Sequence, residues 1–149
     1  MIELFSRTNY LLQEENGLTP IHIDDSVSSL SAILLNDAYY QALMDGREIM
    51  RGISVLKPEW IIPFKAKAWL DLREKKDVDS SDIKKHRNDI IRIVSDMVLQ
   101  KCILPDEVRR DMEKFIEQFD VTESELKNLK IRGTKPEDIK KTLQTTYLD

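Results

Sequence analysis

Two neighbouring segments of the chain carry lysines and carboxylates at a spacing that could bind a phosphate. They are residues 64–72 and 82–89, and both have the alternation of apolar and charged residues typical of amphipathic helices. Lys65 and Lys67 stand two residues apart, so they point in different directions around one helix and only one can serve a given site. Lys65 shares a helical face with Trp69, so its aliphatic chain is expected to pack against apolar neighbours and to direct the ammonium group toward a phosphate. Lys67 is the second choice for this role. The same pattern also fits a lysine that merely covers apolar neighbours.

The second segment allows two interpretations of its charges. Asp82, Lys85 and Asp89 lie at i, i+3 and i+7 along one stripe of the helix. An ion-pair ladder among them would contribute about 0.2–0.5 kcal/mol per pair if exposed, and the sequence alone favours it. Alternatively, one acid orients Lys65 across the helix pair and Lys85 is a second phosphate ligand. For His86 we expect a hydrogen-bonded place in the core, because no serine or cysteine nucleophile is spaced to match it.

Composition narrows the class of protein. The chain has 149 residues, 41% hydrophobic and 34% charged, which is enough apolar material for one domain. Cys102 is the only cysteine, so an intrachain disulfide is excluded and a reducing, cytoplasmic setting is expected. No apolar run approaches the roughly 20 residues of a membrane span, so we expect no membrane partner.

Charge is distributed unevenly along the chain. Residues 57–101 carry 11 basic and 8 acidic side chains, although the whole chain has a net charge of −4. A local positive field favours an anionic ligand such as a phosphate or RNA, although an ordinary solvated helix face is the commoner explanation of so small an excess.

The strands and helices expected around these residues indicate an α+β fold. It has a small N-terminal sheet of short strands and a predominantly helical C-terminal two-thirds. Glycine at 52 favours a tight hairpin between two short apolar strands, and Pro63 either begins or kinks the helix that carries Lys65. The expected strands are residues 2–5, 20–23, 48–50 and 53–56. The expected helices are residues 25–35, 38–44, 58–76, 80–101 and 105–119, followed by two helices with capping boxes at 122–125 and 134–137.

Taken together, these segments resemble a known family. The resemblance rests on residues 2–7, 28–35, 39–40 and 53–56, on the Ile-Pro-Phe-Lys-Ala-Lys-Ala-Trp-Leu-Asp-Leu stretch at 62–72 and on the Asp-Ile-Lys-Lys-His-Arg-Asn-Asp stretch at 82–89. The chain resembles the C-terminal portion of AbiEii/AbiGii toxin-type nucleotidyltransferases, which belong to the DNA polymerase β-like superfamily. The resemblance covers roughly residues 1–100 and divides the chain into a partial nucleotidyltransferase-like region, residues 1–101, and a helical C-terminal extension, residues 102–149.

The resemblance implies roles for particular residues. Glu3 matches the family's third carboxylate and would be a metal ligand, although one carboxylate is an incomplete site. Lys65 matches the lysine of a Lys-x-x-Ala pattern, with Lys67 in reserve. Asp89 matches the final acid, with Asp82 in reserve. The implied cofactors are Mg²⁺ and a nucleoside triphosphate, and an antitoxin is an implied partner.

The family's Gly-Ser motif and the paired acids that should precede Glu3 are missing, so we expect the chain alone to be inactive and not to bind these cofactors alone. Transfer of a nucleotide depends on positioning and on neutralising charge, which those motifs supply. The first hypothesis is therefore a nucleotidyltransferase-like fragment that needs a complementary chain. The alternative is a non-catalytic interaction module that forms a homodimer, or completes a partner chain's sheet, through an open strand edge. A third hypothesis is RNA binding through the basic middle of the chain.

Overall fold

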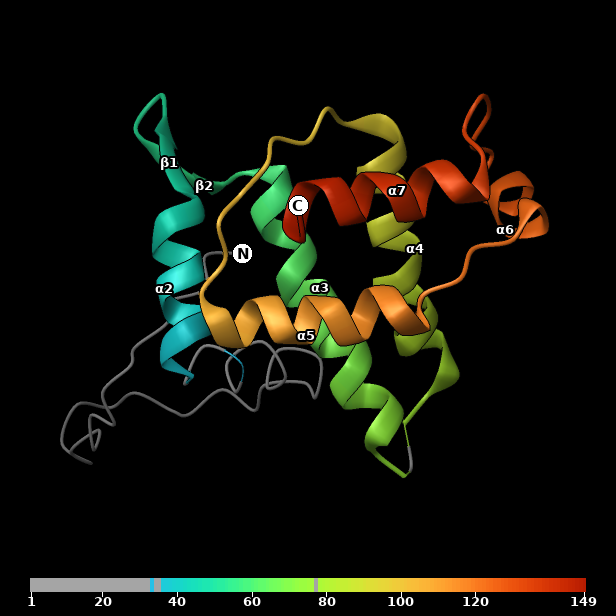
Figure 1. Ribbon diagram of the computed structural model, residues 1–149, viewed down its shortest axis with the longest axis horizontal. Helices are drawn as coiled ribbons and strands as arrows, with labels where there is room; N and C mark the ends of the chain where they lie inside the picture. Colours follow the sequence, from blue (N-terminus) through green and yellow to red (C-terminus); the bar gives the residue numbers. More distant parts are fainter. Residues whose placement is uncertain (1–32, 34–35, 77) are drawn as a thin grey trace, which may run out of the picture.

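The computed structural model describes residues 33, 36–76 and 78–149, and these form a helical body with one protruding hairpin (Figure 1). The strands expected at 2–5 and 20–23 lie outside the described residues, as does all but residue 33 of the helix expected at 25–35. The elements are α2 Asp37–Gly46, β1 Arg47–Met50, β2 Ile53–Leu56, α3 Pro58–Glu74, α4 Ser80–Asp96, α5 Asp106–Gln118, α6 Glu123–Asn128 and α7 Pro136–Tyr147.

The α+β class is confirmed by one antiparallel pair of strands beside the helices. Strand β1 pairs with β2 in a register that places Arg47 opposite Leu56 and Met50 opposite Ile53. The turn between them has positive φ at both Arg51 (51°) and Gly52 (80°), which is the conformation of a tight hairpin turn. The hairpin predicted from the glycine at 52 is therefore present.

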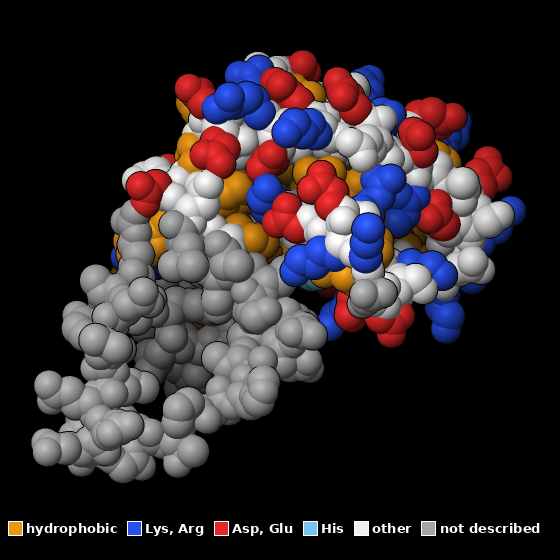
Figure 2. Space-filling view, turned by 90° about the horizontal axis from the view of Figure 1, so that it is seen from below, with side chains coloured by type: hydrophobic (Ala, Val, Ile, Leu, Met, Phe, Trp, Pro, Cys, Tyr) orange, Lys and Arg blue, Asp and Glu red, His pale blue; other side chains and the backbone are white. Residues whose placement is uncertain are grey.

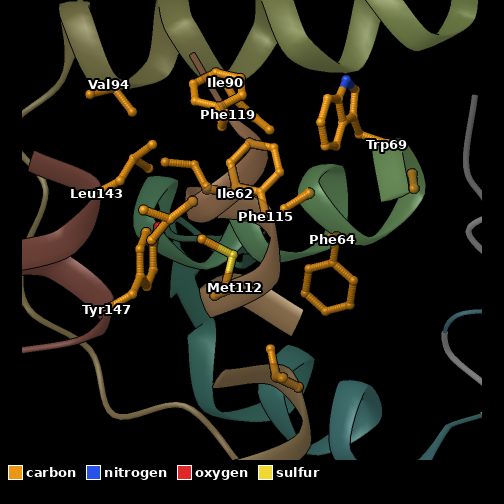
Figure 3. Packing of buried hydrophobic residues seen from close by; sticks show 14 of the residues in the cluster. Ile62, Phe64, Trp69, Ile90, Val94, Met112, Phe115, Phe119, Leu143 and Tyr147 are labelled. Carbon is orange, nitrogen blue, oxygen red and sulfur yellow. The ribbon is translucent and has the colours of Figure 1, made fainter. Parts of the chain in front are cut away.

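Helix α3 lies at the centre of the described body, with α2, α4 and α5 packed against it. Trp69 of α3 makes edge-to-face contacts with Phe115 of α5 and with Phe119, which directly follows α5, at ring-centroid distances of 5.3 and 6.4 Å. Figure 3 shows these rings close to Ile90 of α4 and Ile62 of α3, so residues before and after position 101 share one core. Aromatic pairs in this geometry stabilise a core beyond the area they bury.

Helix α3 begins at Pro58 and continues through Pro63, so Pro63 lies inside the helix and does not begin it. Pro63 has no N–H, and the carbonyl of Glu59, four residues earlier, therefore loses its helical donor. The hydroxyl of Tyr147, in the last turn of α7, donates a hydrogen bond to that carbonyl at 2.5 Å. Tyr147 and Glu59 are both buried, so this contact satisfies a group that water does not reach and fastens α7 to α3.

The predicted end of α4 is wrong. Helix α4 ends at Asp96, not near Lys101, because the chain then runs extended and the Cys102 N–H donates to the Thr146 carbonyl, 3.2 Å away. Helix α4 begins at Ser80 as predicted, and Asp79 caps its start by accepting from the Ser81 N–H.

Helix α7 begins one residue later than its predicted capping box, because Pro136 takes the first helical position. The Asp138 carboxylate then accepts from the Lys135 N–H at 3.0 Å. The box predicted at Thr122 and Glu125 is present as expected.

Gly46 ends α2 where the backbone passes close to Trp60. A Cβ added at Gly46 would lie 2.3 Å from Trp60 Cγ and 2.8 Å from Leu56 Cδ1. Alanine normally favours a helix over glycine, but here the clash dominates. We expect Gly46→Ala to lower the free energy of unfolding by about 1–3 kcal/mol in urea titrations, whereas Asp45→Ala should change it by less than about 0.5 kcal/mol. A stabilised Gly46→Ala variant would contradict the close approach.

The Tyr147 hydroxyl contact gives a second prediction. Tyr147→Phe should lower the free energy of unfolding by about 1–3 kcal/mol, because it leaves the Glu59 carbonyl buried without a donor. In a Pro63→Ala background the new Ala N–H reaches that carbonyl, so the same substitution should cost much less. Urea denaturation of the four proteins of this cycle measures the difference. An equal cost in both backgrounds would show that the hydroxyl does not replace the missing helical donor.

Candidate functional site

The structure brings Lys65 of α3 and Asp89 of α4 together. The Lys65 Nζ donates a hydrogen bond to Asp89 Oδ2 at 2.7 Å, and the two side chains keep 26% and 34% of their surface exposed. This is a short, charge-assisted contact at a surface that solvent still reaches. An ammonium group has three donors, so Lys65 keeps donors for a second acceptor such as a phosphate oxygen.

The predicted ladder on α4 is wrong. Within the described part of the chain, Lys85 makes no ion pair with Asp82 or Asp89, and both Lys85 and Asp82 are exposed. Asp89 turns instead toward Lys65, because α3 and α4 pack side by side and a cross-helix partner is nearer. Lys85 and Asp82 therefore lie outside the Lys65–Asp89 contact.

His86 lies beside this ion pair and differs from the hydrogen-bonded core histidine that we expected. Its Nδ1 is buried and has no hydrogen-bond partner within the described residues. Burial lowers the pKa of His86, the positive charge of Lys65 lowers it further, and the negative charge of Asp89 opposes them. His86 is therefore held neutral next to a lysine that stays paired.

Lys67 belongs to a different cluster, which joins three helices. Its Nζ lies 3.1 Å from Asp71 Oδ1 and 3.5 Å from Asp111 Oδ2 of α5. The Tyr39 hydroxyl of α2 donates to Asp111 at 3.0 Å. Burial lowers the pKa of Lys67, but the hydrogen bond with Asp71 and the charge of Asp111 outweigh it, so the net pKa is raised. With two acids on it, Lys67 has less free charge for a ligand than Lys65.

The described residues hold no ready-made cluster of metal ligands. No group of three or more His, Cys, Asp or Glu side chains gathers among them, and Glu3 lies outside the described residues. The chain does contain one Asp-x-Asp triplet, at residues 77–79, but it follows the lysine helix, and Asp79 is engaged as the cap of α4. Among the described residues, one carboxylate contacts Lys65, that of Asp89, and Mg²⁺ held there would take its other oxygen ligands from water and substrate phosphates.

Cys102 is not an activated nucleophile. Burial, followed by the negative charge of Glu59, raises the pKa of the Cys102 thiol to about 12. A thiol with so high a pKa stays protonated and unreactive near neutral pH.

The surface seen from below mixes the two signs of charge. Figure 2 shows Lys and Arg side chains intermingled with Asp and Glu side chains over the coloured part of that face.

Among the described helices, none combines the length and the apolar character that a membrane-spanning helix requires.

Comparison of the chain with protein-family models, with curated proteins and with solved structures finds no match.

Sequence reasoning missed two contacts that fix the surroundings of the site. Asp111 lies 44 residues after Lys67, and no local spacing joins them. Arg87 donates to Glu125 at 2.9 Å and also to the Asp120 carbonyl, which attaches α6 to α4. Both contacts depend on how helices pack, and the only available signal was that each acid lies next to an apolar core position.

Asp89 and Asp82 offer a matched pair of substitutions. Asp89→Asn should lower the free energy of unfolding by about 0.5–1 kcal/mol, the upper range for an ion pair that solvent partly screens. Asp82→Asn should change it by less than about 0.5 kcal/mol. Urea denaturation at low and high salt is the measurement, and the Asp89 effect should shrink at high salt. Equal effects of the two substitutions would contradict the cross-helix pair.

The lowered pKa of His86 predicts a pH dependence of stability. The unfolded chain binds a proton near the ordinary histidine pKa of 6.5, and the folded chain binds it only at lower pH. The contribution of neutral His86 to the free energy of unfolding is therefore fully present above pH 6.5 and is lost as the pH falls below that value. His86→Gln should flatten this decline in thermal melts, whereas His22→Gln reports what the other histidine contributes. A decline that His86→Gln leaves unchanged would contradict the burial of Nδ1.

Proposed function

We propose that the chain is the C-terminal portion of a nucleotidyltransferase-like protein of the AbiEii/AbiGii toxin type, in which Lys65 contacts the triphosphate of a nucleotide. The observation that supports this is the Lys65–Asp89 pair, a partly exposed ammonium held across two helices by one carboxylate. The resemblance assigns the same two residues to the family's helical lysine and final acid. A cytoplasmic location, where nucleoside triphosphates are abundant, and an antitoxin partner belong to this proposal.

Asp89 would act as a positioning residue. It orients the flexible lysine stem, so less conformational entropy is lost when a phosphate binds. One carboxylate leaves Lys65 a surplus of donors, whereas the two carboxylates around Lys67 neutralise that side chain. This difference in pairing favours Lys65 as the phosphate contact.

The chain alone would bind nucleotide weakly and would not transfer it. A triphosphate carries several negative charges, and one lysine offsets only part of them. The remaining neutralisation would come from Mg²⁺ held by carboxylates of a complementary chain, with Glu3 as this chain's own contribution. Nucleotidyl transfer depends on this charge balance and on alignment of the phosphate.

Isothermal titration with ATP and Mg²⁺ tests the role of Lys65. We expect a dissociation constant of about 1 mM, as for a site that lacks most of its charge. Lys65→Met should weaken binding about fivefold or more, and Lys67→Met should change it less than about twofold, since Lys67 is already neutralised. Circular dichroism checks that both variants fold. Absence of heat at millimolar ATP, or equal losses in the two variants, would rule out this phosphate contact.

The hairpin favours a second candidate function, a non-catalytic interaction module. Ile49, Met50 and Ile53 are 72%, 57% and 66% exposed, and among the described strands β1 and β2 pair only with each other. A two-stranded ribbon with apolar side chains and open edges is suited to pairing with a second copy or with a partner's sheet.

Light scattering distinguishes this second candidate from the first. Self-association should disappear in an Ile49→Thr/Ile53→Thr variant, which keeps strand propensity but removes apolar surface. Val98→Thr is the control, because Val98 is 96% exposed and lies far from the hairpin in the sequence. A wild-type chain that stays monomeric at high concentration would exclude self-association through this hairpin.

A further inference from the structure

The connection from α6 to α7 forms an open basic hollow that lies apart from the Lys65 site. The hollow has a volume of about 650 Å³ and is lined by Lys127, Lys130, Ile131 and Arg132. Residues 126–135 include four basic side chains and no acidic one, although the whole chain is net negative. A volume of this size is in the range of small-molecule sites, and its lining favours an anion.

Two backbone hydrogen bonds hold the turn that carries these cations. The Ile131 N–H donates to the Leu126 carbonyl at 2.9 Å, and the Lys130 N–H donates to the Lys127 carbonyl at 3.0 Å. This double contact is the Schellman arrangement that ends a helix, with Leu126 buried beneath it. The backbone between Lys127 and Ile131 is therefore fixed in shape, which positions the bases of the lysine side chains.

Lys130 occupies a backbone conformation that normally selects glycine. Its φ is +60°, in the left-handed region, and glycine is the usual residue at this point of a Schellman turn because it has no Cβ to strain. A lysine at this position gives a less stable fold than glycine would, but it places a charged side chain on the turn. Strain of this kind is characteristic of functional positions.

The cations of the hollow are not neutralised within the described structure. Lys127, Lys130 and Arg132 form no ion pair with any described residue. Two acids near this turn are engaged elsewhere, since Asp120 pairs with Lys140 and Glu125 with Arg87. An external anion is therefore the available partner for this charge.

We propose that Lys127, Lys130 and Arg132 form a binding site for the phosphate groups of a nucleotide or of a nucleic-acid backbone. Arginine can contact two phosphate oxygens at once and lysines add point charges, which together suit an oxyanion. The site is independent of the proposed function, because it shares no residue with the Lys65–Asp89 pair. Phosphate is the shared chemistry, and the experiment separates its two sources.

The test uses Lys130→Gly with Arg51→Gly as its matched control. Both substitutions remove one positive charge at a left-handed position, but Arg51 lies at the hairpin, at the opposite end of the molecule in Figure 1. Both should raise Tm by about 2–4 °C, because glycine relieves the backbone strain. The full-length chain is titrated at low salt with ATP and, separately, with a fluorescein-labelled oligouridylate.

Lys130→Gly should weaken binding about three- to tenfold and reduce the salt slope by about one, whereas Arg51→Gly should leave both unchanged. A Lys127→Gln/Arg132→Gln variant, which keeps the strained turn, should weaken binding further. Binding of ATP alone would identify a free nucleotide as the ligand, and binding of the oligonucleotide alone would identify a polymer backbone.

Three results would overturn the proposal. Wild-type chain that binds neither probe has no such site. Equal losses in Lys130→Gly and Arg51→Gly would show a general charge effect. ATP binding that Lys65→Met abolishes and Lys130→Gly leaves intact, with no oligonucleotide binding, would assign the phosphate contact to the Lys65 site alone.

Discussion

The packing of α7 against α3 depends on one hydrogen bond, which replaces the backbone donor that Pro63 removes from α3. Pro63 removes the donor that the Glu59 carbonyl needs, in the middle of the helix on which α2, α4 and α5 pack. The Tyr147 hydroxyl, which reaches in from the end of the chain, supplies that donor. A buried carbonyl without a donor would be costly, so the position of α7 and the continuity of α3 constrain each other.

This constraint determines how the charged side chains are presented. Lys65 follows Pro63 by two residues and faces α4, where Asp89 meets it. Lys67 faces α5 and contacts Asp111 of that helix as well as Asp71 of its own helix. Two lysines of one helix, two residues apart, thus have different partners and different free charge. The contrast arises because different faces of α3 pack against different neighbours.

Local patterns predicted most of the described elements, and tertiary packing decided the exceptions. Apolar periodicity and turn residues predicted the hairpin, the lysine helix and the capping box at Thr122, since each depends on neighbours in the sequence. The end of α4 could not be predicted, because it follows from the contact between Cys102 and the distant Thr146. The candidate site divides in the same way. Helical spacing placed Lys65 on one helix and Asp82 and Asp89 on the next, and the resemblance pointed to Asp89. Asp111, which also accepts from the Tyr39 hydroxyl, reaches Lys67 through packing alone.

The central claim is that the Lys65 ammonium, held by Asp89, contacts phosphate. The most direct measurement is a titration of the ¹⁵N-labelled chain with ATP and Mg²⁺, followed by amide chemical shifts. Our account predicts a set of shifted amides centred on the middle of α3 and the facing turns of α4, separate from any set at residues 127–132. Amides of α3 and α4 that do not move at millimolar ATP would contradict it.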